Sequence, residues 1–142
     1  MKFTVTDLKL LTKMLRSANT EDEIQLSKRL RGKQPGFYTL IDDVRIDTRC
    51  TDSFRFCSLF CSLALQRAEL INGCDFPTFS GSELVEIAGK IVRENEQIGK
   101  RACTYPDRVQ KHVLAGSHFD NEDSSWLRMM ISAFLFTLEG HP

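Results

Sequence analysis

Two cysteines one helical turn apart are the first residues in this chain whose spacing could do chemistry. Cys57 and Cys61 share a face of a helix, and such a pair can supply two ligands to a metal ion. Further ligands are not apparent, because no two cysteines have zinc-knuckle spacing and His112 and His118 are loosely placed. Small side chains continue along the same face: Cys57, Cys61, Ala64 and Ala68. We therefore predict helix packing at this face, and no metal or other cofactor.

Carboxylates gather at two places in the sequence, Asp42, Asp43 and Asp47, and then Glu83, Glu86, Glu94 and Glu96. Paired carboxylates inside a helical bundle can bind Mg²⁺, so an enzyme with a carboxylate metal site is one function to weigh. The glutamates alternate with Lys90 and Arg93, which is typical of a solvated helix face, and the aspartates suit a turn. His118 lies near Ser117 and Asp120, but catalytic triads assemble in space and not along one loop. We predict no catalytic residue and a protein that is not an enzyme.

The densest basic cluster consists of Lys28, Arg29, Arg31 and Lys33. It offers an alternative function, a regulator that binds nucleic acid through local positive charge. The opposite end of the same predicted helix carries Glu21, Asp22 and Glu23, which would repel phosphates. Basic residues in a last helical turn also complement the helix dipole in any protein.

The last predicted helix, 124–139, is apolar around most of its circumference. Its candidate partner-binding residues are Trp126, Met129, Met130 and Phe134. Methionine and tryptophan are enriched at protein interfaces, where methionine adapts its shape and tryptophan supplies a large anchored area. The alternative is that the other helices enclose this helix completely.

A central core helix over 52–71 has the clearest pattern in the chain. Its polar residues follow a single narrow stripe: Arg55, Ser58, Ser62, Gln66 and Glu69. Further helices are predicted to begin at Thr6, Thr20, Ser80 and Thr104, from capping residues and the apolar spacing behind them. The segment 37–47 predicts an ordered connection, either a short β-hairpin around Asp42 and Asp43 or an irregular turn of helix. The expected fold is an all-α bundle of about six helices around the central helix, forming one domain over 1–142.

The whole chain is electrically neutral, with 19 basic and 19 acidic residues among 142. It has no global charge bias toward nucleic acid or a membrane surface. The five cysteines are an odd number, the N-terminus lacks the apolar core of a signal peptide, and the longest apolar run, 126–138, is too short for a bilayer span of ~20 residues. We therefore expect a cytoplasmic protein with reduced thiols and no membrane partner. The function we expect is a small protein-interaction module, an adaptor, inhibitor or regulatory subunit that docks an apolar helix face on a protein partner or on a second copy of itself.

Overall fold

The computed structural model describes residues 2–49, 51–98, 104–117 and 119–140 of the chain. Within these ranges it contains α1 (Val5–Ser17), α2 (Thr20–Lys33), α3 (Pro35–Thr48), α4 (Thr51–Asn72), α5 (Gly81–Ile98), α6 (Thr104–His112) and α7 (Asn121–Glu139). The prediction of an all-α bundle is confirmed, with seven helices in the described ranges where about six were expected. None of the helices in this part of the chain combines the length and the apolar character needed to cross a bilayer.

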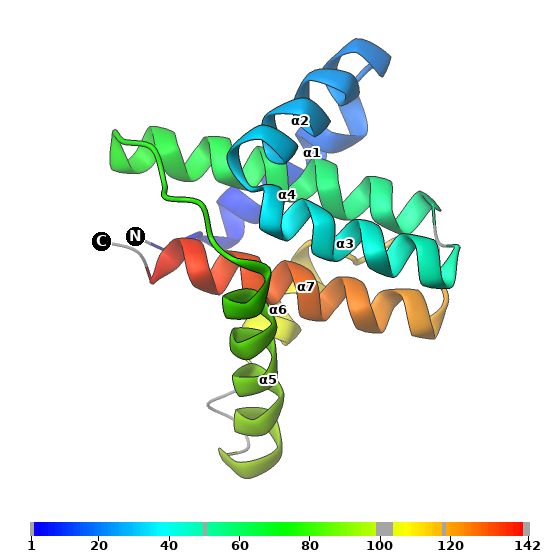
Figure 1. Ribbon diagram of the computed structural model, residues 1–142, viewed down its shortest axis with the longest axis vertical. Helices are drawn as coiled ribbons and strands as arrows, with labels where there is room; N and C mark the ends of the chain where they lie inside the picture. The colour runs from blue at the N-terminus through cyan, green and yellow to red at the C-terminus, as the bar shows by residue number, and fades with distance from the viewer. Residues whose placement is uncertain (1, 50, 99–103, 118, 141–142) are drawn as a thin grey trace.

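The central helix is α4, whose predicted span of 52–71 differs from the observed Thr51–Asn72 by one residue at each end. Figure 1 shows α4 running across the full width of the molecule, and the helix packs against α1, α2, α3 and α7. Its small side chains Cys57, Cys61, Ala64 and Ala68 are all fully buried, as the sequence predicted. The polar stripe is partly buried too, since the Ser62 hydroxyl donates a 2.7 Å hydrogen bond to the Leu26 carbonyl of α2. These contacts place α1, α2, α3 and α7 around α4, whereas α5 and α6 pack mainly on α7.

Residues 37–47 form neither a hairpin nor an irregular turn, which corrects the expectation for this segment. They belong to α3, which begins at Pro35, where the missing amide hydrogen costs nothing. Phe37 and Ile41 lie one helical turn apart and are both fully buried. The Arg45 guanidinium forms a 2.8 Å ion pair with the Asp42 carboxylate, and an α-helix brings residues three apart within reach of such a contact. The apolar residues therefore follow a helical period, and the strand-like alternation at 44–47 is too short to compete with it.

Most helix starts lie within three residues of their predicted positions. The Ser80 and Glu83 capping box is present, with the Glu83 amide donating to the Ser80 hydroxyl at 3.1 Å. The first helix is capped by Thr4 where Thr6 was expected, and the second by Asn19 where Thr20 was expected. The last helix begins at Asn121, not at 124, because Asp120 caps it by accepting from the Asp123 amide at 2.7 Å. In each of these three cases a polar residue slightly upstream supplies the cap.

Gln34, a fully buried glutamine that joins α2 to α3, fixes the segment that connects α4 to α5. Its side-chain amide donates to the Pro77 carbonyl at 2.8 Å and accepts from the Phe79 amide at 2.9 Å. Gly36 lies so close to this segment that a Cβ there would stand 2.8 Å from the Phe79 carbonyl oxygen. These contacts hold the start of α3 against the start of α5.

Candidate functional site

The structure divides the four predicted partner-binding residues between the core and the surface. Phe134 is fully buried, with its ring centroid 4.4 Å from that of Phe37 on α3. Met130 is 9% exposed and belongs to the margin of the core. Trp126 and Met129 are half-buried and line an open hollow at the surface. The predicted set is therefore one core residue and three residues that reach a common hollow.

This hollow, the α3–α7 groove, is lined by Val44 of α3 and by six residues of α7: Asn121, Glu122, Ser125, Trp126, Met129 and Met130. It has a volume of about 690 Å³. The two helices run antiparallel, because Phe37 near the start of α3 contacts Phe134 late in α7, whereas Val44 shares the groove with the early residues of α7. Figure 1 shows α3 and α7 extending beside each other toward the right of the molecule.

The α7 side of the groove is anchored to the central helix. The Ser53 hydroxyl, at the start of α4, donates a 3.0 Å hydrogen bond to the Asp123 carboxylate in the first turn of α7. Ser53 is buried, and Leu127, one turn further along α7, is fully buried. These contacts fix the first turns of α7 to α4, so the backbone that carries Trp126 and Met129 is supported.

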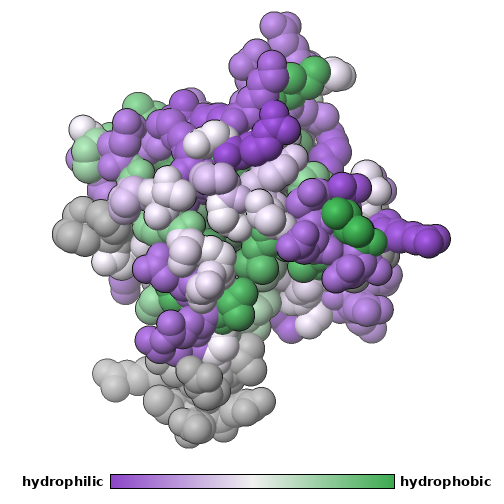
Figure 2. All heavy atoms as spheres, viewed as in Figure 1, coloured by the Kyte–Doolittle hydropathy of each residue, from purple (hydrophilic) through white to green (hydrophobic). Residues whose placement is uncertain are grey.

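Polar residues also line the groove, and Glu122 is the acidic one among them. Glu122 is exposed at its α7 side, and Asp47 is exposed on α3 one helical turn beyond Val44. Figure 2, viewed from the same direction as Figure 1, shows green apolar residues among purple hydrophilic ones around the right-hand ends of α3 and α7. Within the described part of the chain the buried indole nitrogen of Trp126 has no hydrogen-bond partner. An apolar hollow with an acidic rim is a surface that suits a partner with apolar anchors and positive charge.

The predicted basic cluster does not form one patch. Arg29 and Lys33 both bind Glu69 of α4, the lysine at 3.0 Å from the carboxylate. Lys28 and Arg31 project elsewhere and line a separate hollow between α2, α3 and α4. The four side chains are therefore shared between two faces of α2, as residues at i, i+1, i+3 and i+5 must be.

The predicted carboxylates likewise stay apart. Asp42 is paired with Arg45, Asp43 and Asp47 are exposed, and the Glu86 carboxylate lies 3.8 Å from the Lys90 ammonium. The side chains of Glu94 and Glu96 fall outside the described residues. Among the groups that the structure does describe, no three His, Cys, Asp or Glu side chains are placed to hold a metal ion.

Cys57 and Cys61 have the chemistry of core residues. Burial, together with a hydrogen bond and a charge interaction with Cys57, raises the pKa of the Cys61 thiol well above its usual range. The thiolate is the form that binds metals and attacks electrophiles, so this environment disfavours both. His112 is half-buried at the end of α6, and His118 lies outside the described residues.

Sequence reasoning missed Val44, because its alternation with Arg45 and Ile46 resembled a strand. It also missed Tyr38 and Phe54, which line the hollow beside Lys28 and Arg31. Helical spacing in 35–48 was the signal that could have placed Val44 and Tyr38. Comparison with protein-family models, with curated proteins and with solved structures finds no match to this chain.

Proposed function

We propose that this protein is a small, non-enzymatic protein-interaction module whose α3–α7 groove binds an amphipathic helix of a protein partner. The observation that carries the proposal is the half-buried apolar lining of this hollow, with Trp126 and Met129 on α7 facing Val44 on α3. Helix-in-groove recognition works in this way, with apolar anchors spaced by about one turn that enter a preformed hydrophobic channel.

The groove residues have complementary roles in such a complex. Trp126 supplies the large rigid surface that anchors of this type provide, and truncating such a residue commonly costs about 2 kcal/mol or more of binding energy. Met129 has three rotatable bonds and a polarizable sulfur, so it adapts to anchors of different shape. Burial of these two side chains by the partner would provide most of the affinity.

The rim sets which helix binds. Glu122 lies in the lining, and Asp47 lies one helical turn from Val44 on α3, so both carboxylates place negative charge near the groove. A partner helix with lysine or arginine beside its anchors is favoured, and an acidic one is repelled. The contact should therefore form faster at low ionic strength, because rim charges act mainly on the association rate.

The test is a selection of displayed helical peptides with the full chain as bait, followed by affinity measurement on purified variants. Met129→Lys places a positive charge in the groove and removes an apolar contact. Leu70→Lys is the matched control, since Leu70 is 71% exposed near the far end of α4. Circular dichroism checks that both variants keep the helical fold.

We expect the enriched peptides to share two apolar anchors about one turn apart with flanking lysine or arginine. They should bind the Met129→Lys variant at least tenfold more weakly than the wild type and bind the Leu70→Lys variant equally well. Failure to enrich any peptide, or equal binding to both variants, contradicts the proposal. If the chain forms a dimer that the Met129→Lys substitution dissociates, the occupant of the groove is a second copy of the chain and not another protein.

A further inference from the structure

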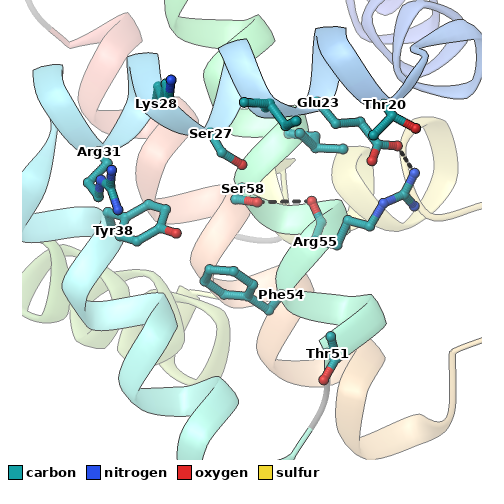
Figure 3. Close-up of a pocket in the computed structure, with 12 residues that line it drawn as sticks. Thr20, Glu23, Ser27, Lys28, Arg31, Tyr38, Thr51, Phe54, Arg55 and Ser58 are labelled. Carbon is teal, nitrogen blue, oxygen red and sulfur yellow. Dashed lines mark hydrogen bonds and ion pairs between the residues drawn. The ribbon is translucent and has the colours of Figure 1, made fainter.

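A second hollow, the α2–α4 pocket, lies between α2, the first half of α3 and the first turns of α4 (Figure 3). Its volume is about 410 Å³. Pockets that hold small molecules commonly measure about 300–1,000 Å³ and combine apolar walls with a few polar groups. The pocket shares no lining residue with the α3–α7 groove, so the two sites are separate.

Two aromatic rings form one wall of this pocket. Tyr38 of α3 and Phe54 of α4 pack edge to face, with centroids 5.6 Å apart and ring planes at 79°. Figure 3 shows the two rings beside each other, with the charged residues of α2 above them. Ile24 and Leu59 add aliphatic surface. A planar ring from a ligand could pack here in the offset or edge-to-face arrangements that aromatic groups prefer.

The charge of the pocket is positive. Its lining holds three cations, Lys28, Arg31 and Arg55, and one carboxylate, Glu23. Glu23 is ion-paired with Arg55, as the dashed line in Figure 3 marks. Lys28 and Arg31 have no acidic partner within the described part of the chain. Two of the cations in the lining therefore have no counter-charge from the described part of the protein.

Uncharged hydrogen-bonding groups complete the lining. The Ser58 hydroxyl donates to the Arg55 carbonyl at 3.0 Å, which leaves its oxygen able to accept another bond. The Ser27 hydroxyl has no partner among the described residues and turns toward Ser58 in Figure 3. Hydrogen bonds to these hydroxyls could thus orient a polar ligand, in addition to the attraction from the charged residues.

We propose that the α2–α4 pocket binds a small ligand that carries an aromatic ring and a phosphate group, in the class of nucleoside monophosphates and aryl phosphates. The phosphate lies between Lys28 and Arg31, and the ring packs on Tyr38 and Phe54. A phosphomonoester carries a charge of about −1.5 to −2 at neutral pH, which matches the two unpaired cations. Arginine adds a planar fork that binds phosphate oxygens in pairs.

The test is a titration of the ¹⁵N-labelled full chain at low salt with adenosine 5′-monophosphate and with phenyl phosphate, followed by amide chemical shifts. Adenosine and phenol serve as the ring-bearing halves of the two ligands, and inorganic phosphate serves as the charged half of both. We expect saturable shifts confined to the residues around the pocket with at least one of the two phosphates. Each corresponding half-ligand should bind at least tenfold more weakly, because it lacks either the ring contact or the charge contact.

Three variants tie the binding to these side chains. Lys28→Gln with Arg31→Gln should weaken binding at least tenfold, and Tyr38→Leu should weaken binding of the ring-bearing ligands without changing that of inorganic phosphate. The matched control is Lys9→Gln with Lys13→Gln, which removes two exposed charges from α1 and should leave binding unchanged. All substitutions lie at exposed or half-exposed positions, so the fold should survive.

The proposal is overturned if neither phosphate saturates at millimolar concentration, or if the α1 control weakens binding as much as the pocket variant does. Inorganic phosphate alone binding as well as the aromatic phosphates would also overturn it, because the ring would then contribute nothing. Single-stranded DNA that binds more tightly than either ligand, with affinity that rises with length, would identify a nucleic-acid surface instead.

Discussion

Phe37 of α3 packs against Phe134 of α7 in the core, with their ring centroids 4.4 Å apart. The contact lies about two helical turns along α3 from Val44 and one turn along α7 from Met130. It fixes the two antiparallel helices at one end, and the α3–α7 groove opens beyond it. Phe134 therefore lies in the core, whereas Trp126 and Met129, earlier on α7, lie at the surface.

Phe134→Ala should unfold the protein far more easily than a truncation in the groove. Removing a fully buried aromatic ring typically costs about 3–5 kcal/mol through lost burial and the cavity left behind. Met129→Ala, at a half-buried position, should cost about 1 kcal/mol. Urea denaturation followed by circular dichroism measures both. Equal losses would contradict the placement of Phe134 in the core and of Met129 in the groove.

Gly36→Ala should destabilise the fold by about 1–3 kcal/mol, because the new Cβ would stand 2.8 Å from the Phe79 carbonyl oxygen and 3.0 Å from the Gly81 nitrogen. Both are backbone atoms, which cannot rotate away. Gly32→Ala is the matched control, since a Cβ there meets no atom within 4 Å and alanine favours a helix by up to about 1 kcal/mol. Thermal unfolding should give a lower melting temperature for Gly36→Ala and a higher one for Gly32→Ala. An unchanged melting temperature for Gly36→Ala would disprove the close approach of α3 to α5.

Asp7→Asn should destabilise the protein at neutral pH, and the difference from wild type should shrink in acid. Burial alone would raise the pKa of Asp7, but the amide and hydroxyl of Thr4, at 2.8 and 2.9 Å, together with Arg67, lower it below its usual value. A depressed pKa means that the carboxylate stabilises the fold above about pH 4 and loses this effect as pH falls through the folded pKa. We expect a loss of about 1 kcal/mol at pH 7 from denaturant titration. A difference that stays constant down to pH 3 would refute the role of the charge.

Glu139→Gln should weaken the hydrogen bonding that holds the N-terminal residues of the chain against α7. The Glu139 carboxylate accepts from the Phe3 amide at 2.7 Å and from the Tyr105 hydroxyl, and it lies 3.8 Å from the Arg108 guanidinium. Its side chain is only 3% exposed, so these bonds are shielded from water. Amide hydrogen exchange by NMR should speed up at Phe3 in this variant. Glu86→Gln, which changes an exposed carboxylate on α5, should leave that rate unchanged.

The fold was largely predictable from the sequence because its signals are local. Capping residues and apolar spacing located α4 and the start of α5, and errors at other ends arose where a second polar residue stood nearby, as Thr4 does beside Thr6. The missed helix, α3, has two adjacent aspartates that resemble a turn. Its ion pair between Asp42 and Arg45 appears only once the helix exists.

The sites were predictable only in part, because each depends on which helix covers which face. An apolar helix such as α7 does not itself reveal that Phe134 meets Phe37 while Trp126 stays at the surface. The split of the basic cluster was readable from helical periodicity, which sets Lys28 and Arg31 on one face. That Glu69 of α4 would bind Arg29 required the tertiary structure.

Peptide binding in the α3–α7 groove can be followed by the fluorescence of Trp126, the single tryptophan of the chain, during titration with a peptide selected against the protein. We predict a saturable change in emission at the concentration at which binding occurs, because the peptide covers the indole in the α3–α7 groove, and the loss of that change in the Met129→Lys variant. Saturable binding of the peptide without any change at Trp126 would place the interaction surface elsewhere and disprove the proposed role of the α3–α7 groove.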